Sequence, residues 1–297
     1  MQRAPHPLLA RYVKTVWISQ PTAGEAHPAP AREHVLPTGL MHLVFRLSGP
    51  GVRIFDSASD GKGRPLGQAL VGGPRAGFYA KDLSTPSHSV GVQLLPGAAQ
   101  ALLGLPADEL AEQHVSLEDL WGDSLAALAR EQLLAAATPQ QTLRRLEALL
   151  LQRLRAGPAQ AAHPLVLQAL RQFEAGVGVQ EAVARSGYSH RQFIRLFSQA
   201  VGLSPKLYCR VRRFQSTLPM LQGPLDLAAV AMEAGYSDQP HMGREFREFA
   251  GLTPEQYRQA RPASANHVAV PPLRGTPPSS PSGQHVNFVQ DRSNAGV

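Results

Sequence analysis

A chain of 297 residues, 43% of them apolar, is long enough for about two globular domains. It has no run of about 18 apolar residues, which argues against a membrane-spanning helix, and residues 1–14 lack the apolar core of a signal peptide, so we expect a cytoplasmic protein. The net charge of +7 favours a polyanionic partner, and the single cysteine, Cys209, excludes an intrachain disulfide.

The first third of the chain is predicted to be β-rich, because short apolar segments alternate with turns of glycine and proline. Strands are expected at residues 40–47, 52–55, 68–71 and 89–95. Helical periodicity follows in residues 98–155, most clearly at 125–137 and 141–154, and Ser116 with Asp119 marks a helix start. These features predict an N-terminal β-rich domain with helices over residues 1–155.

The rest of the chain divides into three segments. Residues 156–163 (AGPAQAAH) are predicted to be a linker, and residues 164–261 form helices separated by short turns. Residues 262–297 are rich in proline, serine and glycine, and we expect a disordered tail there. The overall fold class is therefore α+β, with an all-α C-terminal domain.

The helical segment contains one pattern twice. Gly187-Tyr-Ser recurs at Gly235, and the Gly-Leu-Ser-Pro-x-x-Tyr that begins at Gly202 recurs with threonine at Gly251. Each copy predicts a helix, a tight glycine turn, and a second helix capped by Ser189 or Ser237. Thr253 to Gln256 reads as a further capping box. The sequence therefore predicts two helix-turn-helix units.

The second helix of each copy has one apolar and one polar face. The inward positions are Phe193, Leu196, Phe197 and Ala200 in the first copy and Met242, Phe246 and Phe249 in the second. The outward positions are His190, Arg191, Ile194, Arg195 and Ser198, then Gln239, Pro240, Gly243, Arg244 and Arg247. A short polar helix face that carries arginine suits a major groove, since arginine pairs bidentately with guanine.

A helix over residues 206–222 is expected to join the two units and to carry Arg210, Arg212 and Arg213. Pro219 would kink this helix and change the spacing of the units. Residues 180–215 contain seven Arg and Lys against one acid, while residues 225–258 contain three against six. The first unit is therefore predicted to hold nucleic acid more strongly than the second.

Residues 165–260 resemble the DNA-binding domain of AraC/XylS-type transcription regulators. The first unit matches over residues 187–208. The second matches over residues 235–257, with Asp238, Gln239, His241, Arg244 and Phe246 in place. The resemblance implies contacts by Arg191 and Arg195 in the first unit and by Gln239 and Arg244 in the second. Pro219 and Val183 depart from the family pattern, whereas Pro240 is tolerated in it.

The N-terminal region is similar to the sensor half of some of these regulators. The similarity rests on residues 10–13 before Trp17, on 35–37 with Gly39, on 43–45 and on 91–97. It implies a small barrel or cupin-like fold with a small-molecule pocket. Trp17, His42, Phe45, Tyr79 and His88 are the candidates to line that pocket, although such side chains more often belong to a core.

Together these patterns predict a sequence-specific DNA-binding regulator. The candidate DNA-binding residues are His190, Arg191, Ile194, Arg195, Arg213, Gln239, His241 and Arg244. The expected partner is double-stranded DNA, and RNA polymerase, a small-molecule effector and a second copy of the chain are further candidates. The alternative is a small-molecule-binding protein or enzyme whose basic helical half docks a protein partner. No cofactor is expected, and no enzyme motif is present.

Two other groups of residues could carry chemistry, but a structural role is favoured for both. Glu33, His34, His42 and His88 could bind a metal, yet their spacing matches no tight ligand motif. Cys209 lies near three arginines that would lower its pKa, but no motif surrounds it. We therefore expect no metal site and an incidental cysteine.

Overall fold

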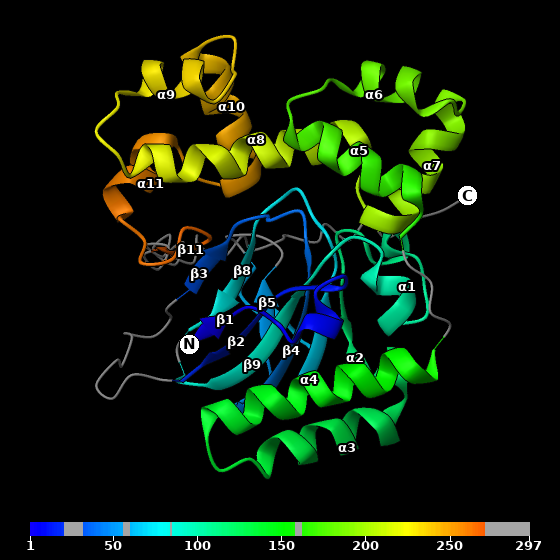
Figure 1. Ribbon diagram of the computed structural model, residues 1–297. Coiled ribbons are helices and arrows are strands. Elements are labelled where there is room, and N and C mark those ends of the chain that lie inside the picture. The colour runs from blue at the N-terminus through cyan, green and yellow to red at the C-terminus, as the bar shows by residue number, and fades with distance from the viewer. Residues whose placement is uncertain (21–31, 56–59, 84, 158–161, 271–297) are drawn as a thin grey trace, which may run out of the picture.

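The computed structural model describes residues 1–20, 32–55, 60–83, 85–157 and 162–270. In these residues two antiparallel sheets form the N-terminal part, and helices follow them (Figure 1). The expected order, a β-rich region with helices and then a helical region, is confirmed. No described helix is both long enough and apolar enough to span a membrane.

The larger sheet has six strands in the order β1-β2-β9-β4-β7-β10. Their bounds are β1 Gln2–Arg3, β2 Val13–Ser19, β4 Met41–Ser48, β7 Ala69–Gly72, β9 His88–Leu94 and β10 His114–Ser116. Side chains alternate along β4: Met41, Leu43 and Phe45 are fully buried on one face, while His42 and Val44 are half-buried on the other. The two faces of the sheet therefore have different neighbours.

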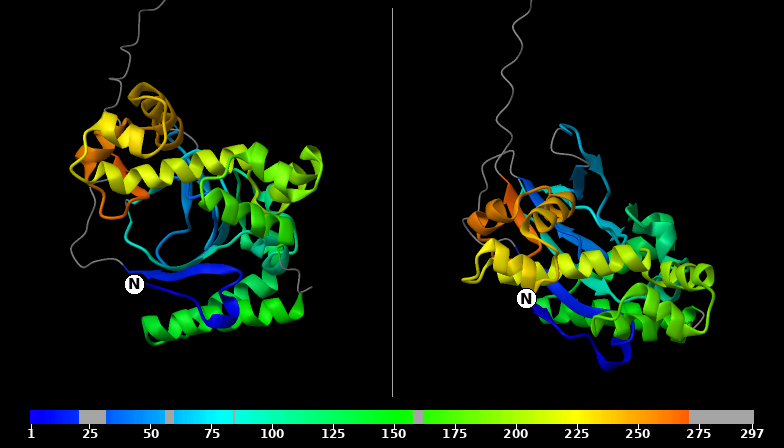
Figure 2. Two further views of the ribbon diagram at one scale, coloured as in Figure 1. Left: turned by 45° about the horizontal axis from the view of Figure 1, so that its top comes forward. Right: turned by 90° about the horizontal axis from the view of Figure 1, so that it is seen from above.

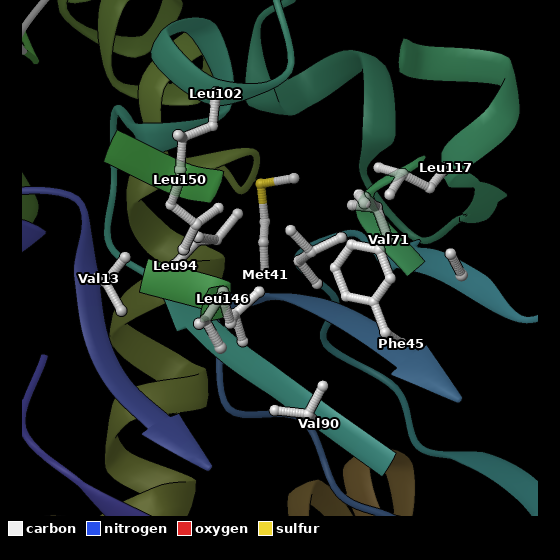
Figure 3. Close-up of a cluster of buried hydrophobic side chains, with 14 of the residues drawn as sticks. Val13, Met41, Phe45, Val71, Val90, Leu94, Leu102, Leu117, Leu146 and Leu150 are labelled. Carbon is white, nitrogen blue, oxygen red and sulfur yellow. The ribbon is translucent and has the colours of Figure 1, made fainter. Parts of the chain in front are cut away.

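Four helices cover the apolar face of this sheet. They are α1 (Ala98–Leu102), α2 (Leu117–Trp121), α3 (Asp123–Leu134) and α4 (Pro139–Ala156). Leu102, Leu117, Leu146 and Leu150 from these helices gather around Met41 and Phe45 (Figure 3). Full burial of each such side chain contributes about 1.5–3 kcal/mol, so this core holds the helices on the sheet.

The smaller sheet has five strands in the order β11-β3-β8-β5-β6. Their bounds are β3 Arg32–Val35, β5 Arg53–Phe55, β6 Arg64–Pro65, β8 Tyr79–Asp82 and β11 His267–Val270. The rings of Tyr79 and His114 meet edge-on between the two sheets, 4.4 Å apart at their centroids. The apolar cluster there is small, since it consists of Val52, Ile54, Leu66 and Leu70.

The helical region is built around one long helix. Its elements are α5 Pro164–Glu174, α6 Val179–Ser186, α7 His190–Val201, α8 Pro205–Leu221, α9 Leu227–Glu233, α10 Gln239–Ala250 and α11 Pro254–Ala260. Figure 2 shows α8 as a yellow rod that joins the first helix-turn-helix unit, α6 and α7, to the second, α9 and α10. Phe193, Phe197, Phe214, Phe246 and Phe249 are fully buried in one core along this rod.

The helical region packs directly on the β-sandwich. Its core includes Leu36 and Ala76 from the sandwich side. The 3₁₀ helix η2 (Ala107–Leu110) lies against the end of α7, where a Cβ on Gly202 would come within 2.1 Å of Pro74 Cγ and 2.8 Å of Ala107 O. The backbone N–H of Gly97 donates to Ala200 O at 2.9 Å. The first unit is therefore fixed to the sandwich through the C-terminal end of α7.

Three expectations about the chain need correction. The segment predicted to be a disordered tail contains β11, which pairs with β3; residues 271–297 lie outside the described residues. The strands β1, β2, β3, β6, β8 and β10 were not predicted: five of them have only two to four residues, and lysine and threonine interrupt the apolar residues of β2 (VKTVWIS). Pro219 lies in the last turn of α8, so it cannot kink the middle of the helix or change the spacing of the units there.

The contact at Gly202 predicts an unequal effect of two similar substitutions. Gly187 and Gly202 both end helices with positive φ, at 73° and 82°, but no atom lies within 4 Å of a Cβ at Gly187. Gly187→Ala should cost about 1–2 kcal/mol of unfolding free energy through backbone strain alone. Gly202→Ala should cost about 1–3 kcal/mol more, because Pro74 and the Ala107 carbonyl must move. Urea unfolding followed by circular dichroism measures both, and equal losses would contradict this packing.

Candidate nucleic-acid interface

The first unit is built as the sequence predicts. Gly187 makes the turn between α6 and α7 at φ 73°, and the Ser189 hydroxyl caps α7 by accepting from Gln192 N at 3.3 Å. Phe193 and Phe197 are buried, and the Phe197 ring meets Tyr208 edge-on at 5.5 Å. The buried face of α7 therefore sets which of its side chains point outward.

The outer face of α7 is free. His190, Arg191 and Arg195 are exposed, and Ile194 is half-buried beside them. Across the residues that the structure describes, neither Arg191 nor Arg195 has an ion pair or a side-chain hydrogen bond. Both guanidinium groups are thus available to a ligand, and they lie in the first two turns of the helix, where the macrodipole favours an anion.

The second unit differs at its cap. Asp238, and not the expected Ser237, caps α10 by accepting from His241 N at 2.6 Å. This hydrogen bond is the main reason that the pKa of Asp238 is lowered. Pro240 sits in the first turn, where a missing N–H costs nothing. A carboxylate therefore stands at the start of α10, whereas α7 begins with a neutral serine.

The outer face of α10 carries its charges farther from the start of the helix than α7 does. Gln239 and Arg244 are exposed as predicted, and so is Arg247. His241 is half-buried: its Nδ1 lies 3.0 Å from the Ser237 hydroxyl, and its ring meets Tyr236 edge-on at 5.3 Å. His241 is therefore held by its own unit more than it is presented to a partner.

Arg213 lies away from both outer faces and does not fit its expected role as a DNA contact. Its guanidinium donates to both carboxylate oxygens of Glu245, from Nη2 at 3.0 and 2.9 Å, and lies over the Tyr236 ring at 4.3 Å from the centroid. Glu245 is only 3% exposed. The charge of Arg213 is therefore used inside the protein, between α8 and α10.

Arg210 completes this buried cluster. Its Nε donates to Glu245 at 2.7 Å, its Nη2 donates to Glu248 at 2.6 Å, and its guanidinium lies over Phe249. Two arginines of α8 thus fix one carboxylate of α10, so the cluster sets the orientation of α10 on α8. Of the basic groups on α8, Lys206 is the one that is fully exposed among the described residues.

Sequence reasoning missed Glu245, although a signal was present. Glu245 stands three residues after Met242 and four before Phe249, on the face predicted to point inward. A charged residue at an inward position requires a buried partner, and the neighbouring Arg244 and Arg247 were predicted to point outward, which left the arginines of the linker helix as candidates. The same cluster explains why residues 180–215 look more basic, and 225–258 more acidic, than their exposed faces are.

The candidate metal ligands do not come together. The described residues contain no group of three or more His, Cys, Asp or Glu that could hold a metal ion. His34 Nδ1 lies 3.0 Å from Ala250 O, and its ring stacks on Phe78. Glu33 pairs instead with Lys81 and with His267 Nδ1 at 2.7 Å. His34 therefore joins the small sheet to the helical region, whereas Glu33 joins strands within that sheet.

The expected pocket residues are also divided. Trp17 and His42 occupy the face of the large sheet that looks toward the small sheet, with Tyr79 opposite, whereas Phe45 points into the core under the helices (Figure 3). An open pocket of about 490 Å³ lies at the edge between β6 and β10, lined by Arg64, Gln113, His114, Glu118 and Asp119 among others.

Burial raises the pKa of the half-buried Cys209 thiol, which disfavours the reactive thiolate.

The buried His114 and the half-buried His42 predict a pH dependence of stability. Burial lowers the pKa of His42 to about 4 and that of His114 to about 3. Between these values and the ordinary pKa of about 6.5, the unfolded chain binds protons that the folded chain does not, so stability must fall as the pH falls. Each group adds a slope of at most about 1.4 kcal/mol per pH unit. His114→Gln should flatten the unfolding free energy measured between pH 6 and 4; an unchanged slope would contradict a neutral buried His114.

The ion cluster predicts which acid of α10 matters for stability. Glu245→Gln should lower the unfolding free energy by about 2–4 kcal/mol, because it leaves the partly buried guanidinium of Arg213 without its counter-charge and leaves Arg210 with only the exposed Glu248. Glu248→Gln is the matched control: that side chain is 56% exposed, so it should cost under about 1 kcal/mol. Urea titration of both variants measures the difference. Equal costs would mean that Glu245 does not hold α10.

Comparison with known proteins agrees with this geometry. Residues 182–260 match a helix-turn-helix domain family, and residues 1–116 match a domain of unknown function (DUF6597). An HTH-type transcriptional regulator of Haemophilus influenzae is 31% identical over 83 residues, which is 28% of either chain. The regulator GbdR of Pseudomonas aeruginosa is 27% identical over 99 residues, covering 33% of this chain and 27% of GbdR. The chain thus matches less than a third of the length of each of these relatives.

Among solved structures, ToxT from Vibrio cholerae bound to a naphthalenyl butenoic acid is similar over 82% of this chain and 97% of its own, at 8% identity and a TM-score of 0.43. An AraC-type DNA-binding domain protein from Chromobacterium violaceum covers 34% of this chain and 94% of its own, at 26% identity and a TM-score of 0.32.

Proposed function

We propose that this chain is a transcription regulator of the AraC type that reads duplex DNA with two recognition helices, α7 and α10. The match of residues 182–260 to a helix-turn-helix domain family supports the proposal. The observation that carries the proposal is the free outer face of α7. Arg191 and Arg195 are exposed there without an internal partner among the described residues. Arginine side chains that have no partner inside the protein can donate hydrogen bonds to a guanine or to a backbone phosphate.

The base contacts follow from exposure. Arg191 and Arg195 read bases from α7, and Gln239 and Arg244 read bases from α10, because glutamine suits adenine and arginine suits guanine. His190 and Ile194 flank the first pair, and Ile194 can contact a thymine methyl group. Arg213 and His241 are assigned to holding the second unit, since both have partners within it.

The two units contribute unequally in this proposal. α7 begins with a neutral cap and presents two free arginines in its first two turns, whereas α10 begins with Asp238 and presents its arginines, Arg244 and Arg247, only from its middle onward. A carboxylate at the N-terminus of α10 repels the phosphates that this end of a helix otherwise attracts. The first unit therefore supplies most of the affinity, and the second adds selectivity.

The N-terminal sandwich modulates DNA binding in this proposal. It contacts the end of α7 through Gly97 and η2, and the end of α10 through His34. A small-molecule effector at the open pocket between β6 and β10, or between the sheets, would act on those contacts. RNA polymerase remains an expected partner of a regulator of this kind.

A second copy of the chain is proposed as a partner of α3. Leu125, Leu128 and Leu134 of this helix are 49%, 48% and 45% exposed. Exposed leucines along one helix suit a helix-to-helix contact between protomers. Because α3 lies on the side of the sandwich away from the recognition helices (Figure 1), such a dimer leaves both outer faces free.

The rival function is a small-molecule-binding protein whose helical half docks another protein. Salt separates the two, because release of counterions makes DNA affinity fall steeply with salt concentration, with a slope of about −0.9 per phosphate contacted. A gel-shift titration at increasing salt with duplexes selected from a random library tests this. An absence of duplex binding at low salt would favour the rival.

Within the DNA-binding proposal, Arg195→Ala should weaken binding to the selected duplex by about 1–3 kcal/mol and relax the preference at one base pair. Arg244→Ala should weaken it less, because it belongs to the weaker unit. Arg185→Ala is the control, since Arg185 is exposed but pairs with Glu181 on α6. Gel-shift titration and repeated selection measure affinity and preference. A larger loss for Arg244 than for Arg195 would overturn the ranking of the units.

A further inference from the structure

β11 follows the second helix-turn-helix unit in the chain, yet it belongs to the sandwich. It pairs antiparallel with β3 (Figure 1), and in this pairing His267 lies opposite Val35 and Val268 opposite His34. The helical region is therefore connected to the sandwich at both of its ends, through the segment before α5 and through β11 after α11. A domain tethered once can swing on its linker, whereas this one is held at two points.

Side chains and backbone groups around β11 tie it to the long helix as well as to the sheet. Val268 is 1% exposed and belongs to the core of the helical region. The backbone O of Asn266 accepts from Leu36 N at 2.8 Å, and its side-chain oxygen accepts from Gln215 Nε2 at 3.1 Å. Gln215 lies on α8 and also donates to Pro37 O at 2.6 Å. One short segment thus joins β3, its following loop and α8.

A side-chain contact holds the other side of β11. His267 Nδ1 lies 2.7 Å from Glu33, which also pairs with Lys81 of β8. Burial raises the pKa of Glu33, but the hydrogen bond from His267 and the charge of Lys81 outweigh it and lower the pKa to about 2. Glu33 is therefore ionised at neutral pH and holds strands on both sides of β3.

The second unit rests on the same part of the sandwich. The Tyr257 hydroxyl of α11 donates to Ala265 O at 2.9 Å, just before β11. His34, which faces Val268 across the strand pair, meets the carbonyl of Ala250 at the end of α10. Phe78 fills the space beside Gly251, where a Cβ would come within 2.5 Å of its ring. The position of α10 is therefore coupled to the pairing of β11 with β3.

We propose that β11 is a strap that fixes the second recognition helix relative to the first, so that both bind one duplex at the same time. The proposal rests on the proposed function. The outer faces of α7 and α10 remain exposed while the strap is in place, so the fastened state is the one that binds. If β11 is released, the second unit is no longer held in place and must be ordered when it binds DNA. This cost reduces the affinity that the protein gains by binding two half-sites at the same time.

Two substitutions in neighbouring residues of the full chain test this. Val268→Asp places a charge in the core and should release β11, whereas Ala269→Asp places the same charge at an exposed position of the same strand. Amide hydrogen exchange of residues 32–35 reports directly whether β3 has lost its neighbour. Gel shifts then compare two duplexes. One is a selected duplex that contains both half-sites, and the other is shortened to the half-site of the first unit, which is identified as the one where Arg195→Ala relaxes the base preference.

Val268→Asp should expose the amides of β3 and weaken binding to the two-site duplex by about ten- to a hundredfold. It should leave binding to the single half-site within about twofold, because the first unit keeps its own contacts with the sandwich. Ala269→Asp should behave as the wild type in both assays. Released β3 amides with unchanged two-site affinity, or with tighter binding, would overturn the proposal.

A second variant covers the case in which Val268→Asp leaves the strand paired or misfolds. It replaces residues 267–270 with Gly-Ser-Gly-Ser and should give the same selective loss. Loss of helical circular dichroism in that variant would count against the proposal, which requires both units to fold without β11. If the wild type binds no duplex, the proposed function fails. The proposal about β11 is then tested separately by amide hydrogen exchange: unchanged exchange in residues 239–250 when β11 is released would refute the role of β11 in holding α10.

Discussion

A single apolar core constrains the whole arrangement. It begins with Phe193 and Phe197 in the first unit, follows α8 through Phe214, and ends with Phe246 and Phe249 in the second. Leu36, Ala76 and Val268 belong to the same core although they lie in or beside the small sheet. Because protein cores are densely packed, neither unit can turn without disturbing side chains that belong to the other or to the sandwich. The spacing of the two outer faces is therefore a property of this core as much as of α8.

The parts of the fold that sequence could predict are those set by local rules. Glycine turns, caps and apolar periodicity placed α7, α8 and α10 within a few residues of their observed bounds, because each rule acts over a single turn. The capping box at Thr253 is confirmed in both of its hydrogen bonds. β11 was missed for the opposite reason. His267–Val270 forms a strand only because β3 is beside it, and no local pattern shows which strand a short segment will meet.

The candidate site was predictable to a similar degree. Exposure of Arg191, Arg195, Gln239 and Arg244 follows from the helical period once the inward phenylalanines are known. Arg213 could not be placed in this way, because a cation on a linker helix has the same sequence pattern whether it meets a phosphate or a carboxylate. The buried Glu245 decides between the two, and its partners come from a helix about thirty residues earlier in the chain. Charge counts along a sequence therefore overstate the difference between the two outer faces.

The position of β11 also has a consequence for how the chain folds. Its partner β3 is made more than two hundred residues earlier, so the edge of the small sheet stays open until nearly all of the described chain has been synthesised. An open edge strand exposes unpaired backbone groups that can pair with other chains. Contacts between such distant segments also form slowly, because a long loop must close first. Completion of the sheet and assembly of the second unit are therefore late, shared events in folding, and a ribosome-bound chain from which β11 has not yet emerged carries both an unfinished sheet and a loosely held recognition helix.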